Sequence, residues 1–371
     1  MRASSNQDAF LALVRAGLWD TDARLSLYET LNFSSIMKIA EEQSVMGLVT
    51  AGLDRVKEVK IPQQWMLQFI GSTLQIEQRN NEMNSFVAQL LGKLQTAGVY
   101  CLLVKGQGIA QCYEQPLWRS SGDVDLLVNG ECYHTTRVIL SKMADSAGKE
   151  TVKNNARMHQ EYQIEGWTVE LHGTMHSNLS RKIDKGIDEV QNEVIYGGKV
   201  RLWTNDGALV YLPAADEDVI FVFTHILQHL FLEGIGLRQI CDWCRLLYTY
   251  REKLDLRMLE QRIRKMGLMT EWKALYNLAN KYLGMPDFGD GLMSHDSRYD
   301  KKSERLMEFV MEVGNFGHNR EVDWSNGLKR RAMLIWHRIT DTIKLSRVFP
   351  IDAPKFLLNY ACDGVRGLVK G

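Results

Sequence analysis

The sequence has no long uninterrupted run of apolar residues. A membrane-spanning helix needs about 18 or more such residues, and the longest candidate, Val219 to Phe231, is shorter and contains two histidines. The segment Met1 to Asp8 also lacks the apolar stretch of a secretory signal peptide. We therefore expect a cytoplasmic protein without integral membrane association.

The sequence also has no net charge, and its cysteines show no disulfide pattern. Lys plus Arg and Asp plus Glu are balanced at 45 each, so no overall field draws the protein toward nucleic acid or membrane. The six cysteines are scattered, which suits a reducing compartment. Cys241 and Cys244 form a CxxC pair inside a helical pattern from Leu237 to Tyr250. We interpret this pair as part of a packed helix rather than as a zinc or redox motif.

Three regions with different residue patterns follow one another along the 371-residue chain. Residues 1–95 have apolar residues at three- and four-residue spacing, and their last segment, Gln63 to Leu94, is either one long helix or two. Residues 96–212 contain short apolar runs separated by loops and short helices, whereas residues 213–371 return to helical spacing. These patterns predict an α+β fold, with a small mixed sheet flanked by N-terminal and C-terminal helical regions.

The middle region contains several predicted strands. Short apolar or alternating runs predict strands at residues 99–104, 123–128, 161–164 and 168–172, the last two joined as a hairpin. We predict a second, shorter strand pair, Val194 to Tyr196 with Val200 to Trp203, joined through two glycines.

Asp123 and Asp125 open one of these predicted strands. Because side chains alternate across a strand, two carboxylates separated by one residue lie on the same face and can share a divalent cation. Without a cation, like charges at short range repel each other. Mg²⁺ prefers carboxylate and phosphate oxygens. The upstream loop Lys105-Gly106-Gln107-Gly108 contains glycines whose backbone N–H groups are able to hold phosphate.

The order of these features resembles the core of the polymerase-beta-type nucleotidyltransferase superfamily. The similarity is closest to a bacterial family of uncharacterised nucleotidyltransferases with the pattern KG…R…DxDLL…ELH. The matching segments are Val104-Lys105-Gly106, Arg119, Gly122-Asp123-Val124-Asp125-Leu126-Leu127-Val128 and Val169-Glu170-Leu171-His172. Abortive-infection nucleotidyltransferase toxins share a similar lysine-glycine and acid-pair arrangement.

The resemblance implies a nucleotidyltransferase-type mixed β-sheet core and a metal-dependent reaction. This reaction moves a nucleoside monophosphate from a nucleoside triphosphate to an unidentified acceptor, which is a small molecule, a sugar, a protein or RNA. The catalytic carboxylates and ligands of Mg²⁺ or Mn²⁺ would be Asp123, Asp125 and Glu170. The nucleotide would be bound by Lys105, Gly106, Gln107, Gly108, Arg119 and Ser121.

Two of these assignments have alternatives. Arg119 is expected to neutralise phosphate charge, but it could instead form a structural ion pair with the aspartates. Gln107 stands where the superfamily usually has glycine or serine, and its bulk reduces access to the loop backbone, although Gly108 could restore the room. Gln107 therefore leaves open a nucleotide-binding module without turnover. A toxin-like transferase that modifies RNA is a further alternative, favoured if the C-terminal basic helix faces the cleft.

Further residues are candidates for lining a cleft: His172, His225, His229, Arg238 and Asp242. Each has a structural alternative, because buried histidines are often hydrogen-bonded core residues and the arginine and aspartate have the spacing of a helical ion pair. The two histidines four residues apart could also bind zinc. The basic segment from Lys329 to Arg347 is interpreted as a solvated helix face, with a phosphate-bearing acceptor or an anionic membrane surface as alternative contacts.

Overall fold

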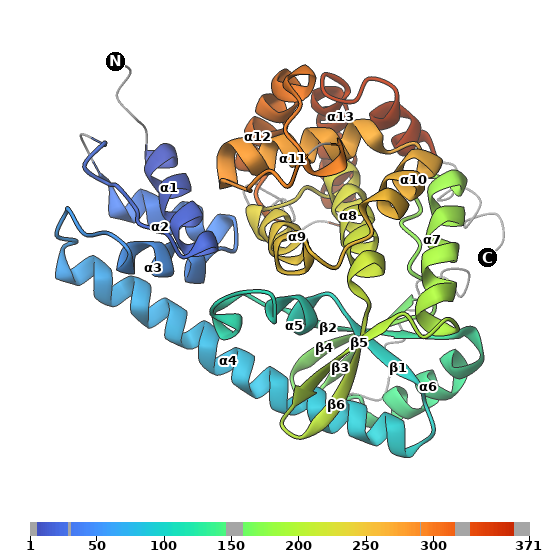
Figure 1. Cartoon of the computed structure of the whole chain (residues 1–371). Coiled ribbons are helices and arrows are strands. Elements are labelled where there is room, and N and C mark those ends of the chain that lie inside the picture. Colours follow the sequence, from blue (N-terminus) through green and yellow to red (C-terminus); the bar gives the residue numbers. More distant parts are fainter. Residues whose placement is uncertain (1–5, 29–30, 146–158, 290, 316–326, 360–371) are drawn as a thin grey trace.

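The structure, a computed structural model, describes residues 6–28, 31–145, 159–289, 291–315 and 327–359. One mixed six-stranded sheet lies between the long helix α4 and a group of C-terminal helices, and a small group of N-terminal helices lies to one side (Figure 1). The α+β class predicted from the sequence is confirmed. None of the described helices is both long enough and apolar enough to span a membrane.

The N-terminal region is helical, as predicted. Its elements are α1 (Asn6–Trp19), α2 (Phe33–Glu42), α3 (Met46–Asp54) and α4 (Gln63–Thr96). The last of these is one continuous helix, although polar residues interrupt its apolar stripe near the middle. The buried Asn80 explains the interruption, because its Nδ2 donates to the carbonyl oxygens of Leu117 and Arg119, each at 2.7 Å. The polar segment therefore supports a loop of the middle region.

The sheet has the strand order β3-β4-β2-β1-β6-β5. Its strands are β1 (Cys101–Val104), β2 (Asp123–Val128), β3 (His159–Ile164), β4 (Trp167–His172), β5 (Val200–Asn205) and β6 (Ala208–Pro213). The central strand β2 pairs antiparallel with β1 and parallel with β4. The predicted strands at 99–104 and 123–128 and the predicted hairpin of β3 and β4 are confirmed.

Only one strand of the second predicted pair is confirmed: Val200 to Trp203 lies in β5, but residues 194–196 do not form its partner. Residues 194 and 195 end helix α7 (Arg181–Ile195), in which Ile183, Ile187, Val190 and Val194 form a buried stripe at helical spacing. The hairpin is instead formed by β5 and β6, and its turn is Asp206-Gly207, where both residues have positive φ. Asp-Gly suits this tight turn because both residue types tolerate positive φ.

The two faces of the sheet pack against different helices. The side chains of Val124, Leu126 and Val128 lie in one apolar cluster with residues of the second half of α4 and with α6 (Gly130–Met143). The opposite face contributes Leu102 and Leu127 to the larger core formed by the helical regions. Because Asp123 and Asp125 alternate with the first set, they lie on the face toward the helices.

The C-terminal region consists of packed helices. They are α8 (Ala215–Leu232), α9 (Leu237–Tyr250), α10 (Leu256–Met266), α11 (Met269–Leu283), α12 (Asp300–Val313) and α13 (Gly327–Ser346). Cys241 and Cys244 are buried and unbridged in α9, as the packed-helix interpretation predicts. Burial raises the pKa of both thiols, so they are chemically inert.

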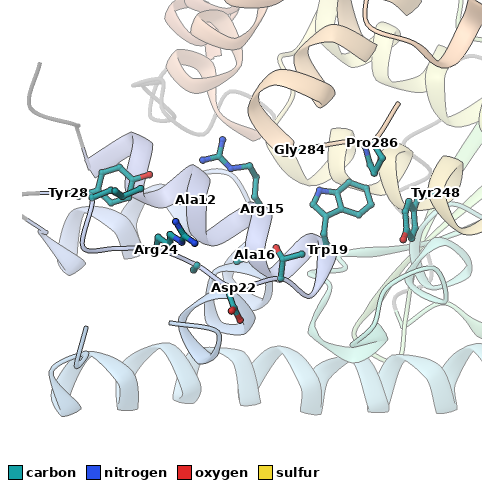
Figure 2. Close-up of a pocket in the computed structure, with 13 residues that line it drawn as sticks. Ala12, Arg15, Ala16, Trp19, Asp22, Arg24, Tyr28, Tyr248, Gly284 and Pro286 are labelled. Carbon is teal, nitrogen blue, oxygen red and sulfur yellow. The ribbon is translucent and has the colours of Figure 1, made fainter. Parts of the chain in front are cut away.

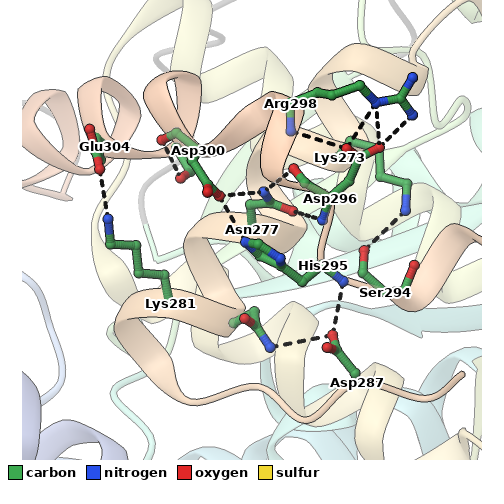
Figure 3. A network of polar contacts seen from close by, with 12 residues as sticks. Lys273, Asn277, Lys281, Asp287, Ser294, His295, Asp296, Arg298, Asp300 and Glu304 are labelled. Carbon is green, nitrogen blue, oxygen red and sulfur yellow. Dashed lines mark hydrogen bonds and ion pairs between the residues drawn. The ribbon is translucent and has the colours of Figure 1, made fainter. Parts of the chain in front are cut away.

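A polar network fixes the segment that connects α11 to α12 (Figure 3). Asn277 of α11 donates to the backbone oxygen of Asp296 at 2.7 Å and to the carboxylate of Asp300 at 3.0 Å. His295 contacts the same carboxylate of Asp300 at 2.8 Å. These contacts satisfy the polar groups of a long connection that has little secondary structure of its own.

The predicted basic helix is α13. Lys344 pairs with Glu312, and Arg338 donates to the backbone oxygen of Leu232 in α8 at 3.1 Å. Trp336 and Ile335 are exposed. The side chains of Arg330 and Arg331 lie outside the described part of the chain, so the interpretation of this helix stays a prediction.

We expect Glu271 of α11 to make stability depend on pH. Burial and the neighbouring carboxylate of Asp352 raise the pKa of Glu271 to about 8. The folded protein therefore binds a proton that the unfolded chain releases near pH 4.5, and the associated stability is lost as pH rises through about 8. Glu271→Gln removes the ionisation, so it should raise the Tm at pH 8.5 relative to wild type and change it little at pH 4.5. The exposed Glu252→Gln is the control, and a Tm difference for Glu271→Gln that is equal at both pH values contradicts the assignment.

Candidate active site

Three carboxylates meet on the helix-facing side of the sheet. The parallel register places Glu170 of β4 directly opposite Asp125 of β2, and Asp123 lies two residues earlier on the same strand face. One oxygen from each of the three lies within 4.8 Å of the others. The charge of Asp125, followed by burial, raises the pKa of Asp123. The repulsion expected for a convergent acid pair is therefore present.

Lys105 supplies the nearest positive charge. It follows β1 directly, and its Nζ lies 2.6 Å from Oδ1 of the buried Asp125. Burial opposes the charge of Lys105, but Asp125, Glu170 and Asp123 outweigh it and raise the pKa of the lysine. The residue has φ 59° and ψ −149°, a backbone conformation that costs a non-glycine residue about 1–3 kcal/mol. Such strain persists where the surrounding structure holds a side chain in place.

Two histidines surround Glu170. His172 Nε2 lies 2.8 Å from Asp125 Oδ1 and 3.3 Å from Glu170 Oε2, and His159 Nε2 lies 3.2 Å from the same Glu170 oxygen. Burial alone would raise the pKa of Glu170, but hydrogen bonds from both histidines hold it well below its usual range. Hydrogen bonds to Asp125 and Glu170 likewise outweigh burial and raise the pKa of His172.

His159 was not among the residues singled out in the sequence. It lies on β3 directly opposite His172, and the two rings stack with centroids 4.6 Å apart. The sequence could have identified His159, because the hairpin was predicted with its first strand beginning at residue 161. Extending that strand by two residues places His159 directly opposite His172.

The histidines of α8 continue this polar cluster. His225 Nε2 lies 3.5 Å from Lys105 Nζ and 3.0 Å from His229 Nε2, and His229 Nδ1 lies 2.9 Å from Glu233. Burial and the charge of Lys105 lower the pKa of His225 well below its usual value. Among the described residues, the groups that could hold a metal contain neither His225 nor His229. His225 therefore borders the acid cluster as a neutral imidazole.

The loop after Lys105 forms the short helix α5 (Gly106–Ala110). Gln107 is buried, and its Nε2 donates to Asn80 Oδ1 of α4 at 3.0 Å. Its side chain therefore anchors the loop and does not cover the backbone. A Cβ at Gly108 would lie 2.7 Å from the side chain of Leu212, so this glycine permits close packing of α5 on β6. Gly106 has positive φ, and a Cβ placed there would lie 3.6 Å from the backbone oxygen of Asp123.

Arg119 forms a buried ion pair with Asp242 of α9. Its Nε and Nη2 donate to the two carboxylate oxygens at 2.8 and 2.7 Å, and its Nη1 donates to Ser121 Oγ at 2.8 Å. Tyr113 Oη also donates to Asp242 at 2.7 Å. The expected alternative, a structural ion pair, is thus formed, but with Asp242 rather than with Asp123. A planar guanidinium suits this bidentate contact.

The suggested helical pair of Arg238 with Asp242 is not formed. Arg238 Nη1 donates instead to the backbone oxygen of Ser120 at 3.1 Å. Its buried Nε has no hydrogen-bond partner, and no described carboxylate lies within ion-pair distance of its guanidinium. Burial, followed by the charge of Arg119, lowers the pKa of Arg238, while Asp242 and Asp123 oppose this shift. A positive charge without a direct counter-ion therefore lies near Asp123.

A cavity in the described part of the chain lies away from the acid cluster. It has a volume of about 510 Å³ and is bordered by α1, the segment after it, and residues near the ends of α9 and α11, including Trp19, Arg15 and Tyr248 (Figure 2). None of the residues of the acid cluster lines it. The convergence of charged groups, rather than cavity size, locates the candidate active site.

Comparison of the sequence with known families found a matching family. The profile of a family described as "Uncharacterised nucleotidyltransferase" matches residues 29–284, which include every strand and every candidate site residue. The chain therefore belongs to this family, as the sequence predicted. Comparisons with curated proteins and with solved structures found no match. The placement in the wider superfamily stays a prediction.

The backbone strain at Lys105 can be measured by comparing two substitutions. Lys105→Gly and Lys105→Ala both remove the charge, but only glycine adopts the positive φ without a steric penalty. We expect Lys105→Gly to be more stable than Lys105→Ala by about 1 kcal/mol, as measured by chemical unfolding. The exposed Lys185 in helix α7 is the control, where alanine should be more stable than glycine by a similar amount. If the alanine variant is the more stable one at both Lys105 and Lys185, the backbone at Lys105 is not strained.

Proposed function

We propose that the protein is a divalent-metal-dependent nucleotidyltransferase that moves a nucleoside monophosphate from a nucleoside triphosphate to an acceptor hydroxyl or phosphate. Membership of the nucleotidyltransferase family supports nucleotidyl transfer. The convergence of Asp123, Asp125 and Glu170, with one oxygen of each within 4.8 Å of the others, supports the dependence on metal.

The donor set fits a hard cation such as Mg²⁺ or Mn²⁺. Asp123, Asp125 and Glu170 offer only carboxylate oxygens, which are the ligands that these ions prefer beside water and phosphate. When bound, the cation would neutralise phosphate charge and polarise the reacting phosphoryl group. The raised pKa of Asp123 supports the assignment, because a cation would relieve the repulsion that causes it.

Glu170 is a better metal ligand than a proton acceptor. Its two histidine partners keep its pKa well below the usual range, and a carboxylate with a low pKa is a weak general base. The same histidine contacts hold the side chain in one orientation beside Asp125. We therefore assign to Glu170 the role of fixing the cation, with any proton acceptance as a secondary role.

Lys105 and Arg238 are the cations that we assign to the triphosphate. Lys105 lies on the acid cluster itself, and Arg238 lies near Asp123 with one buried nitrogen that has no partner in the described part of the chain. Both would stabilise negative charge on the phosphates or on the departing pyrophosphate. Arg119 and Ser121 take a positioning role instead, because their contacts with Asp242 and each other hold the loop that leads into β2.

The structure does not favour the nucleotide-binding module without turnover. That alternative depended on Gln107 obstructing the phosphate loop, whereas the side chain of Gln107 is buried against Asn80 and Met83 of α4. Gly106 is half-buried, and the side chain of Gln107 is directed toward α4 rather than over the loop backbone.

The first test of the proposed function concerns the acid cluster. Asp123→Asn should abolish divalent-dependent binding of nucleoside triphosphate, measured by calorimetry. Glu170→Gln should reduce transfer of label from an α-labelled triphosphate into a cell extract by about a hundredfold or more. Asp123→Asn should remain folded because it loses a repulsive charge, and Glu170→Gln should remain folded because glutamine keeps the size and hydrogen-bonding capacity of the side chain.

Glu161→Gln is the matched control for Glu170→Gln. Glu161 is exposed and is the direct cross-strand neighbour of Glu170 in the β3–β4 register, but it belongs to neither described metal-ligand group. It should transfer label at the wild-type rate. If Asp123→Asn binds nucleotide with metal as wild type does, the acid cluster is not the nucleotide site.

The second test compares ligands that differ in phosphate number. Lys105→Ala and Arg238→Ala should each weaken triphosphate binding about tenfold or more, and monophosphate binding less, because their charges are assigned to the outer phosphates. Calorimetry with both ligands, together with a melting curve for each variant, measures this difference. An equal loss for both ligands in a folded variant would show that these residues do not contact the outer phosphates.

A further inference from the structure

A second group of metal-ligand side chains lies at the edge of the acid cluster. His159 of β3 and Glu170 and His172 of β4 each offer one ligand atom, and these atoms all lie within 4.8 Å of one another. The antiparallel register makes His159 and His172 direct neighbours, and Glu170 shares their strand face because it precedes His172 by two residues. Two paired strands therefore hold all three side chains.

The spacing of the ligand atoms suits a small ion. Two ligands bonded to one ion at about 2.0–2.1 Å, at a tetrahedral angle, lie about 3.3 Å apart. Glu170 Oε2 lies 3.2 Å from His159 Nε2 and 3.3 Å from His172 Nε2. Both nitrogens therefore lie within reach of an ion bound to Glu170 Oε2. The two imidazole rings are stacked, so binding one ion requires rotation of the rings about their side-chain bonds but no movement of the strands.

The donor types differ from those of the acid cluster. Imidazole nitrogen is a poor ligand for Mg²⁺ but a good one for later transition-metal ions such as Co²⁺, Ni²⁺ and Zn²⁺. Two nitrogens with one carboxylate are a donor set used by metal centres that keep an open position for water or substrate. His159 is 42% exposed, so an ion can enter from solvent and retain such a position.

We propose that His159, Glu170 and His172 form a second metal site that takes a transition-metal ion and excludes Mg²⁺. It shares Glu170 with the carboxylate site, so the two sites together form a centre with unlike donor sets. A metal held by the histidines anchors Glu170 beside Asp125. The proposal concerns metal binding alone and does not depend on the proposed nucleotidyl transfer.

The competing explanation is that the two histidines only donate hydrogen bonds to carboxylates. His172 Nε2 lies nearer to Asp125 Oδ1, at 2.8 Å, than to Glu170, and both contacts are consistent with a structural histidine. This explanation predicts no metal affinity in the histidines. The two explanations are therefore separated by a direct binding measurement.

The experiment uses the full chain and Co²⁺, without nucleotide and with Mg²⁺ in large excess. Co²⁺ is followed by calorimetry and by its visible absorption, which changes when imidazole nitrogen enters the coordination shell. We expect one Co²⁺ per chain, and at least tenfold weaker binding with loss of the visible signal in His159→Gln and in His172→Gln. Asp123→Asn should retain this Co²⁺ site, whereas Glu170→Gln should weaken it.

His176→Gln is the matched control, because His176 pairs with Asp188 and belongs to no described metal-ligand group. Because His159 is exposed, His159→Gln should fold normally. It therefore tests the site even if His172→Gln fails to fold. Co²⁺ binding that is unchanged in His159→Gln, or that excess Mg²⁺ abolishes in wild type, overturns the proposal. Failure of label transfer in wild type would instead count against the proposed function and would leave the Co²⁺ result intact.

Discussion

The parallel pairing of β2 with β4 is the constraint on which the candidate active site depends. It sets Asp125 directly opposite Glu170, and the two-residue period of each strand then places Asp123 and His172 on the same face. A slip of one residue would turn the carboxylates into the apolar cluster formed with α4. The core residues on the other face therefore fix the register, because burying carboxylates there would be costly.

The charges gathered by this pairing are balanced locally. Lys105 and His172 both contact Oδ1 of the buried Asp125, and His159 and His172 both contact Glu170. These contacts lower the cost of burying the acids, but they leave Asp123 with a raised pKa and no ion pair among the described residues. The negative charge of the cluster is thus only partly neutralised by the surrounding protein.

Helix α9 connects the active-site loops to the helical regions. Asp242 binds Arg119 on the loop before β2, and three residues later Arg245 donates to the backbone oxygens of Cys112 and Leu18 at 2.7 and 3.0 Å. Breaking such a buried pair costs about 3–5 kcal/mol, because it leaves a charge without its partner. The position of Asp123 is therefore determined by long-range contacts as well as by its strand.

The sequence by itself determined the local structure and the main acids. The two-residue spacing of Asp123 and Asp125, the β3–β4 hairpin and the buried helix α9 all follow from periodicity, which depends on neighbours along the chain. The family was likewise predicted from the sequence, because the lysine, the acid pair and the glutamate follow one another in a fixed order between residues 105 and 170.

Only the tertiary structure decided which distant groups meet. It paired Arg119 with Asp242 instead of the acid pair, turned Gln107 toward α4, and brought His159 to Glu170. Each contact joins segments whose approach is set by strand order and helix packing. Side chains alone do not encode this approach, because a planar guanidinium or an imidazole can satisfy any nearby carboxylate, and the fold determines which carboxylate is near.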